Sequence, residues 1–226
     1  MLAMRFYALI SFLLFSFITV SSQTDSSSLI KYTPDFKFKE GIYLNFDQVR
    51  TNTPLPKSRI LSTLDYSDPQ FFDRILEKDR IYYYDQIGNK QELKTKNIWG
   101  YSRNGFIYVQ MEDGFFRITL IGAICHFIAS QTTYTNMYNS PYSYSNMDTY
   151  RTNPSYYQNT EMRQYLLNFL TGTILDYTDS SLEAILIQDP ELHDEYMALR
   201  KKKRKQMRFM YIRKFNERHP LYFPQN

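Results

Sequence analysis

Three tight-turn dipeptides constrain the fold of this chain more than any other feature of its sequence. Gly88-Asn89, Asn104-Gly105 and Asp113-Gly114 each separate two strand-like runs, most of which are rich in Tyr, Phe, Ile and Val. Such dipeptides supply the positive φ angles of tight hairpin turns. Aromatic and β-branched flanks favour the pleated surface of a sheet. The sequence therefore predicts an antiparallel β-meander that forms a barrel-like or roll-like sheet.

The sequence extends this pattern toward the C-terminus. Thr171-Gly172 predicts a further hairpin turn, although the preceding stretch "EMRQYLLNFL" also fits a short helix. The stretch "ITLIGAICHFIAS" alternates apolar residues on both faces, with one set at Ile121, Ala123, Cys125 and Phe127 and the other at Ile124 and Ile128. This alternation predicts a single strand with a helix or a second sheet packed on each face.

Two segments before the meander have their own signals. The stretch "KEGIYLNFDQVRTNTP" predicts a strand over Gly41–Leu44, followed by a helical turn that ends before Pro54. The stretch "DPQFFDRILEKDR" predicts a short amphipathic helix, because Asp68 can cap it and Pro69 suits its first position.

The C-terminal segment has the pattern of a long helix. Asp179 or Ser180 can cap "SLEAILIQ", and Asp189-Pro190 begins a second helical pattern that continues to His219-Pro220. A proline resists continuation of a helix through the residue before it, so the pattern ends there. The second helix would be roughly 43 Å long, more than the width of a small domain, so it must kink or overhang. The predicted fold class is therefore α+β, an antiparallel meander with a long C-terminal helix packed against it.

A run of six consecutive cations interrupts the apolar stripe of that helix. The run consists of Arg200, Lys201, Lys202, Lys203, Arg204 and Lys205. The chain as a whole is close to balanced, with 27 Lys and Arg against 23 Asp and Glu, so the basic character is local. Two interpretations stay open. The run is either the solvated middle of a helix that packs at both ends, or it is also a contact for an anionic surface.

The start of the chain predicts export. One cation, Arg5, precedes the uncharged run Phe6–Val20, and small polar residues follow it. This run is shorter than the roughly 20 residues that span a bilayer, and its order is typical of a secretory signal peptide cleaved after Ser22 or Gln23. An uncleaved anchor or a buried N-terminal helix is the alternative. We expect a periplasmic or extracellular protein that is not lipid-anchored, since no cysteine follows the run.

Export narrows the partners that the basic run could contact. An exported protein does not ordinarily meet nucleic acid, so we expect no nucleic-acid partner. The remaining candidate partners are envelope lipids, acidic polysaccharides and acidic envelope proteins.

The expected domain map has five parts. They are a signal peptide over 1–22, a flexible N-terminus over 23–36, a β-rich domain over 37–178, a mobile loop at 130–159 within it, and a helical segment over 179–226. The loop is expected because its sequence consists of Ser, Thr, Asn and Tyr with almost no aliphatic residues, which leaves little apolar surface to bury.

Residue types that carry chemistry are sparse. The three histidines are scattered without metal-ligand spacing, and no phosphate-binding loop or nucleophile elbow is present. Neighbours on a strand point to opposite faces, so Cys125 and His126 are expected to be a buried packing residue and a hydrogen-bonded residue beneath the C-terminal helix. Trp99 fits a core position better than a ligand platform. We predict no catalytic residue, metal or cofactor; the alternative, a glycan-active enzyme, requires two converging carboxylates.

Several motifs in order resemble one group of proteins. They are "GIYLNFDQV", "IWGYSRNGFIYV", "FFRITLIGAICHF", "LTGTILDYT", "DPEL" and "YIRKFNERHPLY". Together they are similar to exported, signal-peptide-bearing proteins of the Bacteroidota for which no activity is known. The resemblance implies a bacterial-envelope location only, and it brings no activity and no site residues. Because no catalytic motif is recognisable, the leading prediction is a non-catalytic binding or structural component of that envelope.

Overall fold

The protein is described by a computed structural model that covers residues 28–112, 114–136 and 156–225. The expected signal peptide at 1–22 lies outside the described residues, as does the greater part of the expected mobile loop, 137–155. The described chain has the predicted α+β class, with antiparallel sheets and a C-terminal helix packed against them.

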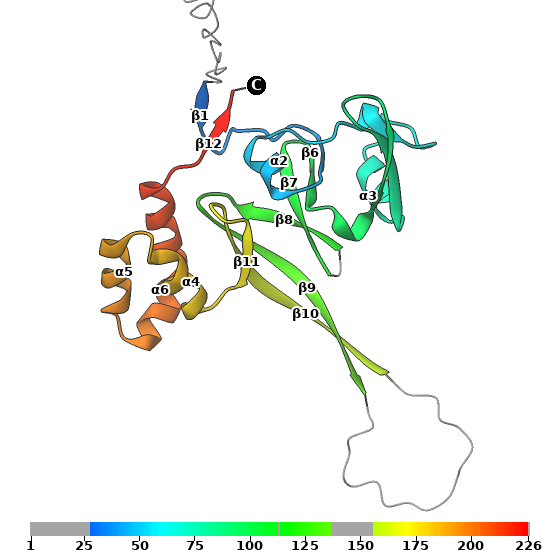
Figure 1. The fold of residues 1–226 in the computed structure, drawn as a ribbon. Helices are drawn as coiled ribbons and strands as arrows, with labels where there is room; N and C mark the ends of the chain where they lie inside the picture. The colour runs from blue at the N-terminus through cyan, green and yellow to red at the C-terminus, as the bar shows by residue number, and fades with distance from the viewer. Residues whose placement is uncertain (1–27, 113, 137–155, 226) are drawn as a thin grey trace, which may run out of the picture.

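A seven-stranded antiparallel sheet forms the centre of the molecule, in the order β11-β10-β9-β8-β7-β6-β2 (Figure 1). Its strands are β2 (Gly41–Tyr43), β6 (Gly100–Arg103), β7 (Phe106–Met111), β8 (Gly114–Leu120), β9 (Ile124–Asn136), β10 (Tyr156–Asn168) and β11 (Thr173–Asp176). The predicted meander is confirmed, because each strand from β6 to β11 pairs with the next. At the β6–β7 turn, Asn104 and Gly105 have φ angles of 54° and 78°, as a type I′ turn requires.

The stretch between β8 and β9 is not the single strand that its alternation predicts. The chain turns between Leu120 and Ile124, and the two strands then pair with each other. Asn216 fixes this turn, since its side chain accepts a hydrogen bond from the Ile124 N–H at 2.7 Å and donates one to the Ile124 carbonyl at 2.9 Å. The anchoring residue is 92 positions away in the sequence, so local alternation could not reveal the turn.

The paired strands β9 and β10 form an arm that extends from the sheet (Figure 1). They pair along their full length, from Ile124 opposite Asn168 to Asn136 opposite Tyr156. The expected loop is therefore wrong at both of its ends, because 130–136 and 156–159 are strand. Thr and Tyr favour a pleated surface even without aliphatic neighbours, and Thr132 and Thr160 hydrogen-bond across the arm at 3.0 Å.

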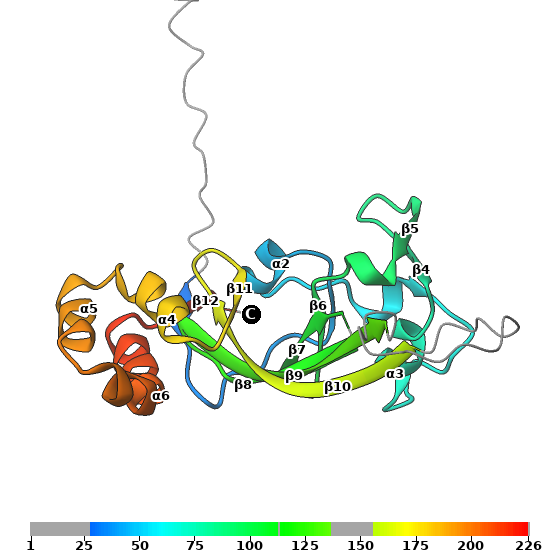
Figure 2. The same ribbon diagram turned by 90° about the horizontal axis from the view of Figure 1, so that it is seen from below.

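The seven-stranded sheet curls around α2 (Phe46–Arg50) and a pair of terminal strands (Figure 2). β1 (Leu29–Lys31) and β12 (Tyr222–Pro224) form this antiparallel pair. The segment 23–36 was expected to be flexible, but its described part contains β1 and aromatic residues that enter the core. The Phe36 ring stacks on the fully buried Phe223 at 4.7 Å, and this burial offsets the entropy of ordering the segment.

A smaller three-stranded sheet has its own core. It consists of β3 (Ile60–Leu61), β4 (Arg80–Tyr84) and β5 (Lys90–Lys94), together with α3 (Phe71–Leu76) and the 3₁₀ helices η1 (Lys57–Arg59) and η2 (Thr95–Asn97). Gly88, with φ 86°, lies in the predicted β4–β5 hairpin turn. The helix α3 begins after the predicted start, because Asp68 and Pro69 form a turn before it in which Asp68 accepts the Gln70 N–H at 2.8 Å.

Three helices make up the C-terminal lobe, α4 (Asp179–Leu186), α5 (Pro190–Met197) and α6 (Lys201–Arg218). The predicted continuous helix is therefore wrong, since it breaks between Met197 and Lys201 and α6 folds back on α5. The fold-back places Tyr211 against Tyr196 with ring centroids 4.9 Å apart, and it lets Lys214 pair with Glu195 at 2.6 Å. A straight helix would leave this apolar surface in water, so burial outweighs helical continuity.

The two faces of β9 lie in different cores. Cys125 belongs to the core that the curled sheet encloses, whereas Ile124 packs with the three helices. The prediction that both faces of this stretch are covered is thus confirmed at the start of β9, whereas Ile128, on the same face as Ile124, is 43% exposed.

Candidate functional site

The basic run lies at the beginning of α6 and not in the middle of a helix. Arg200 precedes the helix in an extended conformation, its side chain makes no capping bond, and the first turn contains no acidic residue. Cations at this end of a helix are unfavourable for the helix dipole. The run therefore destabilises the helix that carries it.

Most of the run is exposed to solvent. The exposed residues are Arg200, Lys201, Lys202, Lys203 and Lys205. The buried residues of α6 all lie in its later part, at Tyr211, Ile212 and Phe215. The run is therefore solvated, as expected, but at a helix start and not as a bridge between two packed ends.

Arg204 differs from its neighbours because it packs at the corner between α5 and α6. Its Nη1 donates to the Met197 carbonyl at 3.4 Å, and its Nε is buried with no hydrogen-bond partner among the described residues. Arg204 therefore belongs to the packing of the lobe, and the candidate surface consists of the five exposed cations.

The cations of α6 fall into two groups according to their partners. In the later part, Arg208 pairs with Asp179, Lys214 with Glu195, and Arg218 with Asp189 at 2.7 Å and with Glu191 at 2.7 Å. Within the described part of the chain, no residue from Arg200 to Lys205 forms an ion pair. Four carboxylates of the lobe, Asp179, Glu195, Asp189 and Glu191, are thus paired with the later cations, and the start of α6 keeps its full charge.

The pKa values of the lobe support this division. The Arg208 guanidinium lowers the pKa of the Asp179 carboxyl, and the Lys214 ammonium lowers that of Glu195. Burial raises the pKa of Asp189, but the Leu192 N–H and its cationic neighbours lower it by more, so the net pKa is below the ordinary value. All three carboxylates are therefore ionised near neutral pH, and each is already paired with a later cation of α6.

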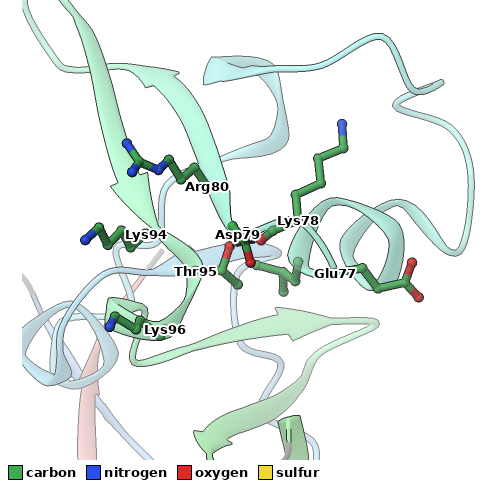
Figure 3. Close-up of a pocket in the computed structure, with 8 residues that line it drawn as sticks. Glu77, Lys78, Asp79, Arg80, Lys94, Thr95 and Lys96 are labelled. Atoms are coloured by element: carbon green, nitrogen blue, oxygen red, sulfur yellow. Dashed lines mark hydrogen bonds between the residues drawn. The ribbon is translucent and has the colours of Figure 1, made fainter.

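A second cationic site lies at the open end of the β4–β5 hairpin, and the sequence reasoning missed it. A pocket of about 380 Å³ is lined by Leu76, Glu77, Lys78, Asp79, Arg80, Lys94, Thr95 and Lys96. Figure 3 shows Arg80, Lys94 and Lys96 extending to the same side of the hairpin. The signal was present in the sequence, because the turn at Gly88 sets a register that places Arg80 opposite Lys94.

The same pocket bears on the hypothesis of a glycan-active enzyme. Two carboxylates, Glu77 and Asp79, line it. In Figure 3 the Glu77 side chain extends away from Asp79. Hydrolysis of a glycosidic bond requires two carboxyl groups that flank the bond, and these two do not converge.

Cys125 and His126 have the surroundings that the sequence predicts. The Cys125 thiol donates to the Gly122 carbonyl at 3.2 Å, and burial raises its pKa to about 12. The His126 ring lies 2.9 Å from Gln164 Oε1 and packs beneath α6 against Phe209, with ring centroids 5.6 Å apart. The two side chains lie on opposite faces of β9, so they do not form a thiolate–imidazole pair.

The described residues contain no group of three or more His, Cys, Asp or Glu side chains arranged to hold a metal ion. Among the helices of the described ranges, none has the length and hydrophobicity needed to cross a bilayer. Comparisons with protein-family models, with curated proteins and with solved structures give no match for this chain. The resemblance to exported proteins of the Bacteroidota therefore stays a prediction.

Proposed function

We propose that the protein is an exported, non-catalytic protein that attaches peripherally to a bilayer rich in anionic phospholipids through the exposed cations of Arg200–Lys205. One observation carries this proposal. The later cations of α6 pair with four carboxylates of the lobe, and in the described chain no carboxylate forms an ion pair with the exposed cations at the helix start. A cluster of this kind at the surface produces a strong local positive potential.

The residue types and the position of this surface favour a layer of lipid headgroups over a single bound anion as its ligand. Four of the five exposed cations are lysines, which are mobile point charges without the fixed fork geometry of arginine. The start of α6, coloured orange in Figure 1, lies at the end of the helical lobe away from β1 and β12. Clusters of four to eight cations on a helix are typical of proteins that bind anionic bilayers, at about 1 kcal/mol for each cation.

The compartment is part of the proposal. The apolar run Phe6–Val20 supports export to the periplasm or beyond, because its length and order are those of a secretory signal. The resemblance to envelope proteins of the Bacteroidota supports the same location. In that setting, the polar surface of a membrane is accessible to the positively charged helical lobe.

Co-sedimentation with lipid vesicles tests the attachment. Replacing Lys201, Lys202, Lys203 and Lys205 with Gln removes four charges, which is worth about 4 kcal/mol at an anionic bilayer. We expect binding to phosphatidylglycerol-rich vesicles to weaken up to roughly a thousandfold, and the binding of the wild-type protein to fall steeply with added salt.

The matched control replaces four other exposed lysines with Gln, at Lys31, Lys37, Lys39 and Lys90. None of these forms an ion pair with a carboxylate in the described residues, so the control changes the net charge equally without touching α6. Equal loss of binding by both variants would mean that the net charge alone controls vesicle binding, and this would contradict a local site on α6. Binding to an acidic polysaccharide that the α6 variant loses, without binding to vesicles, would contradict a lipid partner for this surface.

A further inference from the structure

The exposed face of the β4–β5 hairpin combines positive charge with aromatic rings. The register places Arg80 opposite Lys94, Tyr82 opposite Glu92, and Tyr84 opposite Lys90. All six side chains are exposed, and the exposed fractions of Tyr82 and Tyr84 are 39% and 43%. The opposite face of the hairpin contributes Ile81, Tyr83 and Leu93 to the core of the small sheet. The hairpin is thus anchored on one face and open on the other.

The open end of this face places like charges next to one another. Side chains directly opposite on an antiparallel pair have Cβ atoms about 5 Å apart, and like charges there are destabilising. Glu92 forms an ion pair with Arg80, which compensates one cation of the pair. In the described chain Lys94 and Lys96 have no carboxylate partner. A ligand anion bound between these side chains would relieve the repulsion.

A pocket lies where these charges meet. Its volume of about 380 Å³ is within the range of about 300–1,000 Å³ that is usual for small-ligand sites. Its lining includes four cations, Lys78, Arg80, Lys94 and Lys96, and two carboxylates, Glu77 and Asp79, so positive charge is in excess. Figure 3 shows the charged ends of Arg80, Lys94 and Lys96 on one side. Beyond Arg80 and Lys94, the two exposed tyrosines continue along the same face of the hairpin. The face therefore offers an anion site at one end and aromatic surface beside it.

We propose that this face binds an acidic polysaccharide. One sugar carboxylate binds among Arg80, Lys94 and Lys96 in the pocket, through charge-assisted hydrogen bonds. Neighbouring sugar rings pack their C–H faces on Tyr82 and Tyr84, whose rings provide rigid apolar surface with a polar tip. The class of ligand is a uronic-acid-containing glycan, with its charges spaced by hydroxyl-bearing rings.

The composition of the face favours a glycan over a nucleic acid. Glu92 lies between the cations on the same face, and its carboxylate accepts hydrogen bonds from sugar hydroxyls but repels closely spaced phosphates.

The site is separate from the surface proposed for membrane attachment. In Figure 1 the hairpin follows α3 on the side of the seven-stranded sheet opposite the helical lobe, and the turned view in Figure 2 agrees. Failure of either proposal therefore leaves the other intact, and the lysines of α6 provide a control for the hairpin.

Isothermal titration calorimetry with hexagalacturonate tests the proposal. In the double variant Lys94→Gln and Lys96→Gln, we expect the affinity to fall at least about tenfold, and its dependence on salt to become shallower because fewer charges contribute. The charge-conserving pair Lys94→Arg and Lys96→Arg should retain binding within a few-fold. The matched control Lys201→Gln and Lys202→Gln removes the same charge from the helical lobe and should leave the affinity unchanged.

A second variant tests the aromatic part. Tyr82→Ser should weaken binding of the hexamer several-fold without changing its salt dependence, because it removes ring surface and no charge. Equal weakening by the α6 control and the hairpin variant would overturn the proposal. No binding of hexagalacturonate by the wild-type protein would do the same, as would tighter binding of a single-stranded DNA hexamer than of the glycan. All exposed-residue variants should keep the circular dichroism spectrum of the wild-type protein.

Discussion

Asp179 joins the three helices of the C-terminal lobe, and replacing it with Asn should loosen that lobe measurably. Its carboxylate, in the first turn of α4, accepts hydrogen bonds from Arg208 on α6 and from the Tyr196 hydroxyl on α5 at 3.2 Å. The side chains of Asp179 and Arg208 are only 22% and 13% exposed. The Asn side chain keeps the shape and one acceptor oxygen, so the substitution removes chiefly the charge.

The magnitude follows from these contacts. A hydrogen bond to a charged partner contributes about 1.5–3 kcal/mol, against about 1 kcal/mol for a neutral one. The negative charge at the start of α4 adds about 0.5 kcal/mol through the helix dipole. We therefore expect Asp179→Asn to lower the free energy of unfolding by about 2 kcal/mol, which corresponds to a fall in Tm of about 4–8 °C for a chain of this size.

Urea denaturation followed by circular dichroism measures this change. The matched control is Asp194→Asn in α5, where an 84% exposed carboxylate pairs only with His193; we expect a loss below about 0.5 kcal/mol there. In a double-mutant cycle, Asp179→Asn and Arg208→Gln should show a coupling energy of about 1 kcal/mol or more. A cost for Asp179→Asn no larger than the control, or a coupling near zero, would refute the role of this pair.

The same pair predicts a pH dependence with a definite sign. Arg208 lowers the pKa of Asp179 in the folded protein, so at acidic pH the unfolded chain binds a proton before the folded chain does. The stabilisation is complete above the ordinary carboxyl pKa of about 3.9 and is lost as pH falls through the lower folded value. Stability should therefore fall below about pH 5, with a shallower slope in Asp179→Asn; equal slopes would contradict the assignment.

Two further predictions concern the turn between β8 and β9. Burial raises the pKa of Cys125 to about 12, which leaves on the order of one thiol in ten thousand ionised at pH 8. A thiol reagent should therefore label Cys125 slowly in native buffer and fast in denaturant. Rapid labelling in native buffer would contradict the burial of this residue. A Cβ at position 122 would lie 2.3 Å from the Asn216 side chain. Gly122→Ala should therefore lower the free energy of unfolding, measured by urea denaturation, by about 1–3 kcal/mol. An unchanged midpoint would show that Asn216 does not anchor this turn.

The sequence predicts those parts of the fold that local chemistry determines. Asn104-Gly105 and Gly88 have the positive φ angles that their turns require, and Asp189-Pro190 starts α5, with Asp189 as the cap for the Leu192 N–H. Each of these signals acts over a few residues. The hairpin turns and the Asp189 cap were therefore predictable, and with them the α+β class. The other two predicted caps were wrong, because Thr178 and not Asp179 or Ser180 caps α4, and α3 has no side-chain cap.

The features that the sequence did not reveal depend on distant contacts. The break before α6 contains no Gly or Pro, and it forms because Tyr211 and Phe215 gain burial against α5 and the sheet. The turn at Gly122 depends on Asn216, and β1 depends on its partner β12. Such pairings are decided by tertiary packing, which local patterns do not encode.

The candidate surfaces were likewise predictable from the sequence only in part. The exposure of Arg200–Lys205 was predictable from its charge, but the inward position of Arg204 and the pairing of Arg208 and Lys214 with carboxylates required the folded lobe. The cationic face of the β4–β5 hairpin could have been found by applying the register that Gly88-Asn89 implies.

Lysine footprinting tests the attachment surface most directly. An amine-reactive reagent is applied to the wild-type protein alone, with neutral vesicles and with phosphatidylglycerol-rich vesicles, and the rate at each lysine is read by mass spectrometry. We predict that anionic vesicles alone slow modification at Lys201, Lys202, Lys203 and Lys205, while Lys39 and Lys90 react as in free protein. Equal rates at the α6 lysines in all three conditions, with vesicles in saturating excess, would contradict the proposal that this surface binds anionic lipid.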